Sequence, residues 1–493
     1  MKIVVIGAGL GGLSAAAILA ADGHEVDVFE QNDLIGGKMQ EVRADGFRFD
    51  AGPSTLNMPF LLNEVFAACG KTPETYLEWF PVEPLCRYRF ADGVFFDNYR
   101  DAERNRDELL RVAPEDVDAW EKFMSYSADL YRRSSGSIIF NPLQGLRDLQ
   151  IRDLPGMLNI DSFATVASRV DDFFSSPRLR QLFKQFTVSN GASAYRAPAT
   201  MNIIPYEELR LGGNYIGGGM YRLASALHDL ARDCGANVYT GMPVDLIVPD
   251  PSRKKSISGV MINGSLIEFD AVVAGSDATD TYLNLLPENA LPGLKRRKIS
   301  RTEPSSSGFV VMLGINRTYE DLVHHNVFFS DDHEGELQAI YENGELADEP
   351  TVYLVNTSHT DPDDAPPGCS NLMLFVNAPY TRNGQPWPEW KETYTDHIIH
   401  TLEKRGLCGL RESILVRRTI TPEDFERIYH LHRGSIYGPG MNSKAAALSR
   451  PRNKSPWFRN LYLCGGSTHP GGGIPMVLQS ALNVGLLVKR SEG

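Results

Sequence analysis

The sequence predicts an α/β protein with a helix-covered parallel sheet, a second, mixed sheet and a helical insertion. The segment 2–30 reads as strand, glycine turn, helix and strand, the order of a parallel βαβ unit. A glycine turn, helix and strand recur near residue 220. Apolar stretches joined by polar connectors, at 306–315, 351–358 and 371–379, are typical of strands. With 42% hydrophobic and 23% charged residues, the composition is that of an ordinary globular protein.

The N-terminal segment carries a complete dinucleotide-binding fingerprint. Lys2–Ile6 is a short β-branched run, which suits a buried parallel strand. The glycine turn G-x-G-x-x-G follows at 7–12, and an Ala-rich helix is expected over 13–22. A second strand then ends at Glu30, which is placed to accept hydrogen bonds from ribose hydroxyls. Strand, helix and acid in register therefore predict a Rossmann-type domain.

The residues of this turn have separate expected roles. Gly7 allows the tight turn, Gly9 lets backbone N–H groups approach a pyrophosphate, and Gly12 allows close helix packing. The acid at position 30 disfavours NADP, because it would repel the 2′-phosphate. We predict that this end of the cofactor is held by Gly7, Ala8, Gly9, Gly11, Gly12, Glu30 and Gln31.

The next segment distinguishes FAD from NAD. It carries the doublet Gly36-Gly37, the cation Lys38 and then the turn "DAGP" at 50–53. This pattern is similar to the extended flavin-binding signature of the FAD-dependent amine-oxidase-like superfamily, whose FAD-binding domain is of the glutathione-reductase-like kind. In that superfamily the doublet lies along the cofactor, and the chain returns under the flavin ring at the "DAGP" turn. The resemblance implies FAD as the cofactor, with further contacts from Gly36, Gly37, Lys38, Gly52, Pro53 and Ser54.

The middle of the chain predicts a third piece of the cofactor domain. A helix is expected over 221–232, because apolar residues recur on one helix face at 220, 223, 224, 227, 230 and 231. The superfamily resemblance implies that the backbone of Val244 contacts adenine. A buried strand at 269–275 then leads to a polar turn at Ser276-Asp277, and Asp277 is a further candidate cofactor residue.

The predicted domains are interleaved along the chain. Residues 1–85, 215–285 and 455–493 form a discontinuous FAD-binding domain. Residues 86–214 form a helical insertion, either a membrane-facing lid or a plain helical subdomain, and 286–454 form a mixed-sheet substrate domain. Within the insertion, a helix near Pro114 places Val117, Trp120, Phe123, Met124, Ser127 and Leu130 on one face.

The C-terminal stretch "YLCGGSTHPGGGIPMVLQSA" at 462–481 is a second glycine-rich turn before a helix. It lacks the Lys-Ser/Thr ending of a phosphate-binding P-loop. It closely resembles the C-terminal flavin motif of bacterial-type carotenoid desaturases, the phytoene desaturase family. That family also matches at "FDAGP", at "SSPRLRQLF" and at "GGGMYRL", so the resemblance covers essentially the whole chain. It implies flavin contacts from Gly465, Gly466, Ile474, Pro475 and Met476, with Pro475 in the first turn of a helix.

Candidate catalytic residues are fewer. Arg147-Asp148 matches an Arg-Asp pair in the helical insertion of the family, where polar residues have been considered for proton handling; a surface ion pair is the alternative. His469 is a candidate base, or else it shapes the glycine turn. His430 and His432 alternate on an expected strand and are interpreted as packed or surface residues. Neither a metal-ligand spacing nor a G-x-S-x-G motif is present in the sequence.

The resemblance implies an FAD-dependent desaturase acting on a long apolar polyene. An allylic C–H would give a hydride to flavin N5, and the adjacent carbon would lose a proton; oxygen or a quinone would then reoxidise the flavin. A late-step carotenoid 3,4-desaturase or a terminal carotenoid oxidase is the close alternative. An amine oxidase and a non-enzymatic prenyl-binding carrier of the GDP-dissociation-inhibitor type are the more distant ones. The chain length of the polyene stays open.

Charge and cysteine usage limit partners and location. The net charge of −13 disfavours nucleic acid as a partner. Six scattered Cys without a C-x-x-C pair fit a reducing compartment. Since the chain has no apolar run of about 18 residues, we expect a cytoplasmic protein that is peripherally associated with the inner face of the cell membrane. The basic run 293–301 is either a solvated surface or a contact for anionic lipid.

Overall fold

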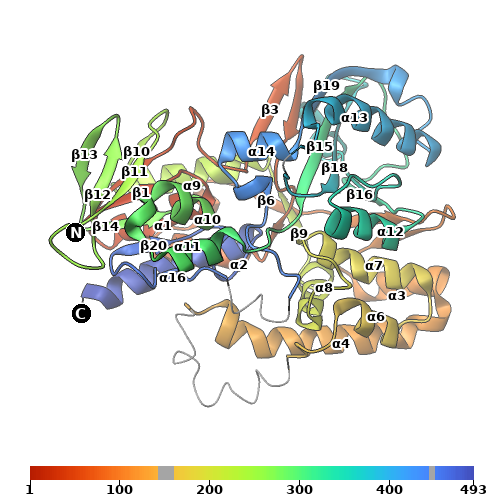
Figure 1. Ribbon diagram of the computed structural model, residues 1–493. Coiled ribbons are helices and arrows are strands. Elements are labelled where there is room, and N and C mark those ends of the chain that lie inside the picture. The colour runs from red at the N-terminus through yellow and green to blue at the C-terminus, as the bar shows by residue number, and fades with distance from the viewer. Residues whose placement is uncertain (143–159, 383, 444–449, 493) are drawn as a thin grey trace.

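The computed structural model describes residues 1–142, 160–382, 384–443 and 450–492. Figure 1 shows a helix-covered sheet that carries both chain termini at one end of the molecule. At the other end, a second sheet lies above a block of helices. This arrangement confirms the predicted fold class.

The first sheet is parallel and draws its strands from separated parts of the chain. Its strand order is β10-β2-β1-β14-β20, and every neighbouring pair is parallel. The helices α1, α9, α16 and α2 pack together with this sheet in one apolar core. The strands are β1 (Lys2–Ile6), β2 (Glu25–Phe29), β10 (Asn237–Tyr239), β14 (Ala271–Ala274) and β20 (Leu461–Leu463), and the helices are α1 (Leu10–Ala21), α2 (Pro59–Ala68), α9 (Tyr221–Asp233) and α16 (Ile474–Glu492).

Local patterns explain these helices. Helix α1 begins at Leu10, three residues before the predicted start, because Gly11 and Gly12 are already part of its first turn. In α9 the predicted apolar stripe is fully buried, whereas the opposite face is polar. An antiparallel three-stranded sheet, β11 (Leu246–Pro249), β12 (Ile257–Ile262) and β13 (Ser265–Glu268), covers the other side of the parallel sheet.

The second sheet has seven strands in the order β19-β15-β18-β17-β16-β7-β8. It is mixed, because β16 and β7 are parallel while the other pairs are antiparallel. The strands are β7 (Cys86–Arg89), β8 (Phe95–Asn98), β15 (Ser307–Ile315), β16 (His325–Phe328), β17 (Val352–Val355), β18 (Ser370–Ala378) and β19 (Ile414–Ile420).

The two faces of this sheet have different partners. On β15, Phe309 and Val311 face the core that includes α13 (Trp387–Lys404), whereas Val310 points to the opposite face. Two small sheets complete the strands: β3 (Glu41–Ala44) with β4 (Phe47–Asp50), and β5 (Leu56–Asn57), β9 (Gly213–Ile216) and β6 (Trp79–Pro81).

The segment 86–214, predicted as helical, begins with the strands β7 and β8 of the mixed sheet. Alternation of apolar and polar residues in "CRYR" suits a half-buried strand, and this signal was overlooked. The expected helical face of α4 is buried as predicted. The remaining α-helices of the described residues are α3 (Ala102–Val112), α4 (Val117–Ser134), α6 (Val166–Phe173), α7 (Pro177–Val188), α8 (Ile204–Leu209), α10 (Ala278–Asp280), α11 (Gly293–Ser300), α12 (His333–Gln338) and α14 (Pro422–Tyr429).

The strand expected at His430 and His432 was wrong. Thr421 and Asp424 form a capping box, and Pro422 occupies the first position of α14, so this segment starts a helix. The helix ends at Tyr429, His430 adopts a left-handed conformation (φ 50°), and a 3₁₀ turn starts at His432.

In the described parts of the chain, no helix combines the length and apolar character needed to cross a membrane.

Candidate active site

One cavity of about 940 Å³ joins the glycine turns of the parallel sheet to the apolar face of the mixed sheet. Its lining residues come from both ends and from the middle of the chain. The predicted cofactor residues that line it are Gly7, Gly9, Gly11, Glu30, Gln31, Gly36, Gly37, Lys38, Gly52, Pro53, Ser54, Val244, Asp277, Gly465, Gly466, Ile474 and Pro475.

The first glycine turn has the geometry of an anion cradle. Gly7 has φ +93°, and a Cβ atom at Gly12 would clash with the carbonyl oxygen of Gly7. Gly9 precedes α1 without any side-chain cap, so the amides of the first helical turn are available to a phosphate. The absence of a side chain at Gly12 therefore allows helix α1 to pack closely against this turn.

Glu30 is held in a fixed orientation at the end of β2. It is 5% exposed, and its carboxylate accepts hydrogen bonds from the backbone amide of Ala8 (2.8 Å) and from the backbone and side chain of Asn32 (3.0 Å each). Ala8 thus positions the acid that faces the cavity. A fixed, buried carboxylate at this place suits recognition of ribose hydroxyls.

The second glycine doublet presents a cation. Lys38 lines the cavity and donates a hydrogen bond to the carbonyl oxygen of Ile436. Burial lowers the pKa of Lys38 to about 8; the charge of Arg450 acts in the same direction, and that of Asp277 opposes it. Burial also raises the pKa of Asp277 to about 6, although this carboxylate caps α10 by accepting two backbone hydrogen bonds.

Arg450 is a buried cation that the sequence analysis missed. Its Nη2 atom donates to the carbonyl oxygens of Tyr437 (2.5 Å) and Gly466 (3.1 Å), and burial lowers its pKa to about 10. A single arginine between loops gives no periodic or motif signal. Arg450 thus holds the C-terminal glycine turn by a hydrogen bond to the carbonyl oxygen of Gly466 and adds positive charge next to it.

The two glycine turns of the sequence meet in space. A Cβ atom at Gly11 would lie 3.0 Å from the amide nitrogen of Gly465. The same amide donates to Ser480 Oγ on α16 (2.8 Å), and Pro475 is in the first turn of that helix. Among the described residues, Val477 lines the cavity, whereas Met476 packs against the apolar core. Two helix N-termini thus border the same cavity.

The predicted catalytic residues have no shown role. Arg147 and Asp148 lie outside the described residues. His469 is 3% exposed, donates its backbone amide to Pro451 (2.9 Å), and its ring Nε2 lies 3.0 Å from the carbonyl oxygen of Asn141. It is not among the described residues that line the cavity, so these contacts fit a structural role in the turn.

The far end of the cavity is mainly apolar. Helix α7 and the mixed sheet supply Leu182, Phe186, Val310, Val327, Met373 and Phe375. Of the described residues, Glu208 of α8 is the carboxylate at this end. The sequence does not single it out, because it lies in an "EE" pair that is typical of a solvated helix surface.

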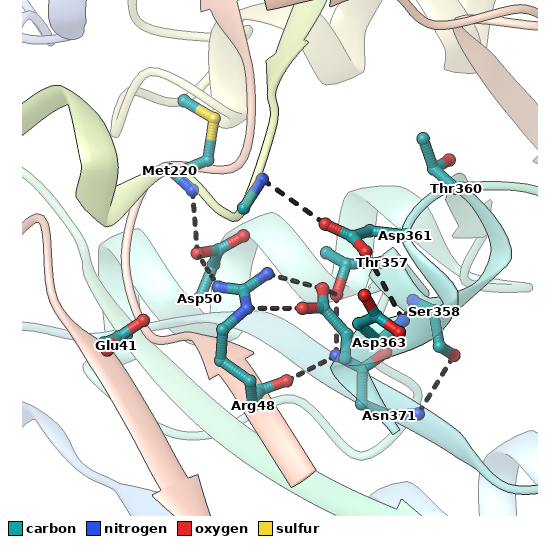
Figure 2. A network of polar contacts seen from close by, with 12 residues as sticks. Glu41, Arg48, Asp50, Met220, Thr357, Ser358, Thr360, Asp361, Asp363 and Asn371 are labelled. Carbon is teal, nitrogen blue, oxygen red and sulfur yellow. Dashed lines mark hydrogen bonds and ion pairs between the residues drawn. The ribbon is translucent and has the colours of Figure 1, made fainter. Parts of the chain in front are cut away.

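A buried ion network lies behind the "DAGP" turn. Arg48 donates hydrogen bonds to Asp50 (2.7 Å), to the hydroxyl of Tyr215 (2.6 Å) and to both carboxylate oxygens of Asp364 (2.5 Å each). The amide of Met220 donates to Asp50 (3.0 Å). Figure 2 shows the guanidinium group of Arg48 between Asp50 and the segment that contains Thr357 and Asn371. This network joins the "DAGP" strand to the glycine turn before α9 and to the mixed sheet.

Comparisons with known proteins agree with this geometry. Residues 10–484 match the family of flavin containing amine oxidoreductases. The chain belongs to this family. It is 35% identical over 483 residues to a 4,4'-diapolycopene oxygenase of Methylomonas sp, covering 97% of this chain and 96% of that one. It is 34% identical to a 4,4'-diaponeurosporene oxygenase of Staphylococcus aureus, covering 98% and 97%.

A solved structure confirms the fold. Cyclohexylamine oxidase from Brevibacterium oxydans superposes with a TM-score of 0.62 at 17% identity and covers 100% of this chain and 99% of that one. The protein is an FAD-dependent oxidoreductase, as its family membership establishes. The cradle of glycines, Glu30 and Lys38 fits the dinucleotide part of FAD.

Proposed function

We propose that the protein oxidises allylic carbon atoms of a long acyclic carotenoid, and that it acts as a terminal oxidase of the diapolycopene or diaponeurosporene kind. One observation carries the proposal: a single cavity has a glycine-lined end that fits FAD and an apolar end that fits a polyene. The names of relatives at 34–35% identity over nearly the whole chain support the carotenoid class.

The lining of the cavity supports an apolar substrate. A polyene has no charged or polar handle, so it must be held by apolar contact and by shape. Phe186 from α7 and Val310 and Phe375 from the mixed sheet present such a surface. When bound, FAD supplies a hydride acceptor, while the protein aligns the carbon chain and excludes water.

Desaturation is the second candidate reaction. The C-terminal turn from Gly465 to Pro475 resembles the flavin motif of phytoene desaturases, which favours insertion of double bonds. Both reactions begin with loss of a hydride from an allylic carbon. They differ in whether the carbon then gains oxygen or the neighbouring carbon loses a proton.

Co-expression tests the two reactions. The chain is produced in four bacterial hosts, each of which accumulates one compound: phytoene, the shorter precursor, 4,4'-diaponeurosporene or 4,4'-diapolycopene. The pigments are then analysed by chromatography and mass spectrometry. Terminal oxidation adds one oxygen and removes two hydrogens at a methyl group, whereas desaturation removes two hydrogens only. If all four pigments are unaltered although the purified protein contains yellow flavin, the proposal is wrong.

We also propose a cytoplasmic location with contact to the inner face of the cell membrane. The basic helix α11 supports this, because its residues are mostly exposed and Leu294 is 84% exposed. Co-sedimentation with anionic and neutral vesicles tests it: binding that neither requires anionic lipid nor falls with salt would contradict it.

Oxygen and quinone, as electron acceptors, are distinguished by which of them restores the oxidised flavin spectrum after anaerobic reduction.

A further inference from the structure

Glu208 is an isolated carboxylate at the apolar end of the cavity. It lies on α8 and lines the cavity, and among the described residues no group donates a hydrogen bond to it. The other acids that line the cavity lie at the opposite end, on or next to the parallel sheet: Glu30, Asp245, Asp277 and Asp280. Glu208 is of intermediate exposure, and a partly desolvated carboxylate without a hydrogen-bond donor lowers the stability of the fold.

The groups that face Glu208 are uncharged near neutral pH. Cys86 and Tyr88 on β7, Tyr353 on β17 and Tyr437 line the same cavity, and burial raises the pKa of each above its ordinary value. The charge of Glu208 adds to each of these pKa shifts, so all four lie within its electrostatic reach.

Histidine does not compete with Glu208 as a base in this region. Burial lowers the pKa of His325, on β16, to about 4. Its ring Nδ1 lies 2.9 Å from the carbonyl oxygen of Leu85, and this contact raises the pKa, but the effect of burial is larger, so the histidine is neutral near pH 7. Burial alone raises the pKa of Glu208 to about 7. Glu208 is therefore the group at this end that changes protonation near neutrality.

This end of the cavity adjoins the turn that the family resemblance places under the flavin. The hydroxyl of Tyr353 lies 2.8 Å from Ser54 Oγ, directly after the "DAGP" turn. His325 Nε2 lies 3.3 Å from Thr55 Oγ1. Tyr353 and His325, which line the same cavity as Glu208, are thus within hydrogen-bond distance of residues of the cofactor turn.

We propose that Glu208 is the proton acceptor for carotenoid oxidation in this cavity; this rests on the proposed function. When bound, FAD would accept the hydride of an allylic C–H with its two electrons, and one proton would be released for each such transfer. In terminal oxidation the proton comes from the water whose oxygen bonds to the carbon, and in desaturation it comes from the adjacent carbon, whose C–H electrons form the double bond. In both cases the proton ends on a carboxylate oxygen of Glu208 and leaves to solvent before the next turnover.

The neighbouring acid offers a matched control. Glu207 lies on the same helix, and burial together with the charge of Glu208 raises its pKa to about 8. In the described chain it is not among the residues that line the cavity. Substituting Glu207→Gln therefore changes a partly buried carboxyl of the same type without changing the wall of the cavity.

The experiment measures turnover of the pigment that the wild type converts, against pH, for the holoenzyme and for Glu208→Gln, Glu208→Asp and Glu207→Gln. We expect the kcat/KM of the wild type to rise as the pH is raised through about 7. In Glu208→Gln, kcat/KM should be about 10²- to 10⁴-fold lower and should no longer show this rise with pH. Glu208→Asp keeps a weaker rise, and Glu207→Gln keeps the wild-type rate within a few fold. Flavin content checks that each variant still binds FAD.

Infrared spectroscopy gives a readout that does not depend on turnover. A protonated carboxyl band should disappear as the wild-type holoenzyme is titrated through a pH of about 7 and should be missing in Glu208→Gln. A band assigned to Glu208 that titrates below pH 5 overturns the proposal, and so does a Glu208→Gln variant with wild-type rate and pH profile. In the latter case the proposed function stands, whereas a wild type that alters no carotenoid refutes the proposed function itself.

Discussion

Substituting Arg48→Ala should be the most destabilising single change in the ion network behind the "DAGP" turn. The guanidinium group makes hydrogen bonds to two buried carboxylates, Asp50 and Asp364, and to Tyr215. Without it, Asp50 keeps the Tyr215 hydroxyl and one amide, and Asp364 keeps the hydroxyl of Thr357 (2.5 Å). Two negative charges then remain buried without a cation. Removing one partner of such a buried pair costs about 3–5 kcal/mol of unfolding free energy.

Urea denaturation followed by intrinsic fluorescence measures this loss, with the FAD-free protein used for every variant. Arg43→Ala is the control, because its side chain is 68% exposed and pairs, within the described chain, with Glu41 alone, also on β3; it should change the unfolding free energy by no more than about 0.5 kcal/mol. Adding Asp364→Asn to Arg48→Ala should recover part of the loss, since one uncompensated charge disappears. Equal midpoints for Arg48→Ala and Arg43→Ala would refute the reasoning, and absence of any recovery would assign the loss to packing instead of charge.

Three further predictions concern the cofactor. Gly12→Ala should abolish FAD retention during purification, because its Cβ atom would clash with the carbonyl oxygen of Gly7; Gly293→Ala, with open space around its Cβ, should retain FAD normally. Glu30→Ala should weaken FAD binding about 10- to 150-fold, the equivalent of about 1.5–3 kcal/mol for charged hydrogen bonds, in a fluorescence titration; unchanged affinity would remove Glu30 from the site. Burial lowers the pKa of Lys38 to about 8, so its positive charge is present below that pH and lost above it, and affinity for the anionic cofactor should fall between pH 7 and 9. Lys38→Met should flatten this dependence, and a slope that persists in the variant would contradict the assignment.

The sequence was sufficient to single out many of the residues that line the glycine-rich end of the cavity. Gly7, Gly9, Glu30 and Lys38 belong to local motifs whose glycine spacing and strand–turn–helix context are readable without a fold. The helices α4 and α9 were equally readable, because each buries one stripe against a core. Family resemblance then assigned the second glycine turn to the same cofactor.

Other residues gave no such signal. Arg48 pairs with Asp364, which is 316 residues away in the chain. Arg450 is buried between the loops that contain Tyr437 and Gly466, and Glu208 lies in a cavity without a hydrogen-bond donor among the described residues. The strands β7 and β8 were overlooked because they join a sheet whose other strands come much later in the chain. The strand expected around His430 failed because the capping box at Thr421 sets up a helix instead.

By itself the sequence determined the chemistry of the cofactor end, because a phosphate cradle needs particular residues at fixed local spacing. Only the tertiary structure decided how the two glycine turns share one cavity, with Gly11 against Gly465, and which acid lies at its apolar end. The physical reason is that backbone conformation is encoded within a few residues. Burial, charge pairing and pKa, by contrast, depend on what the rest of the chain places around a side chain.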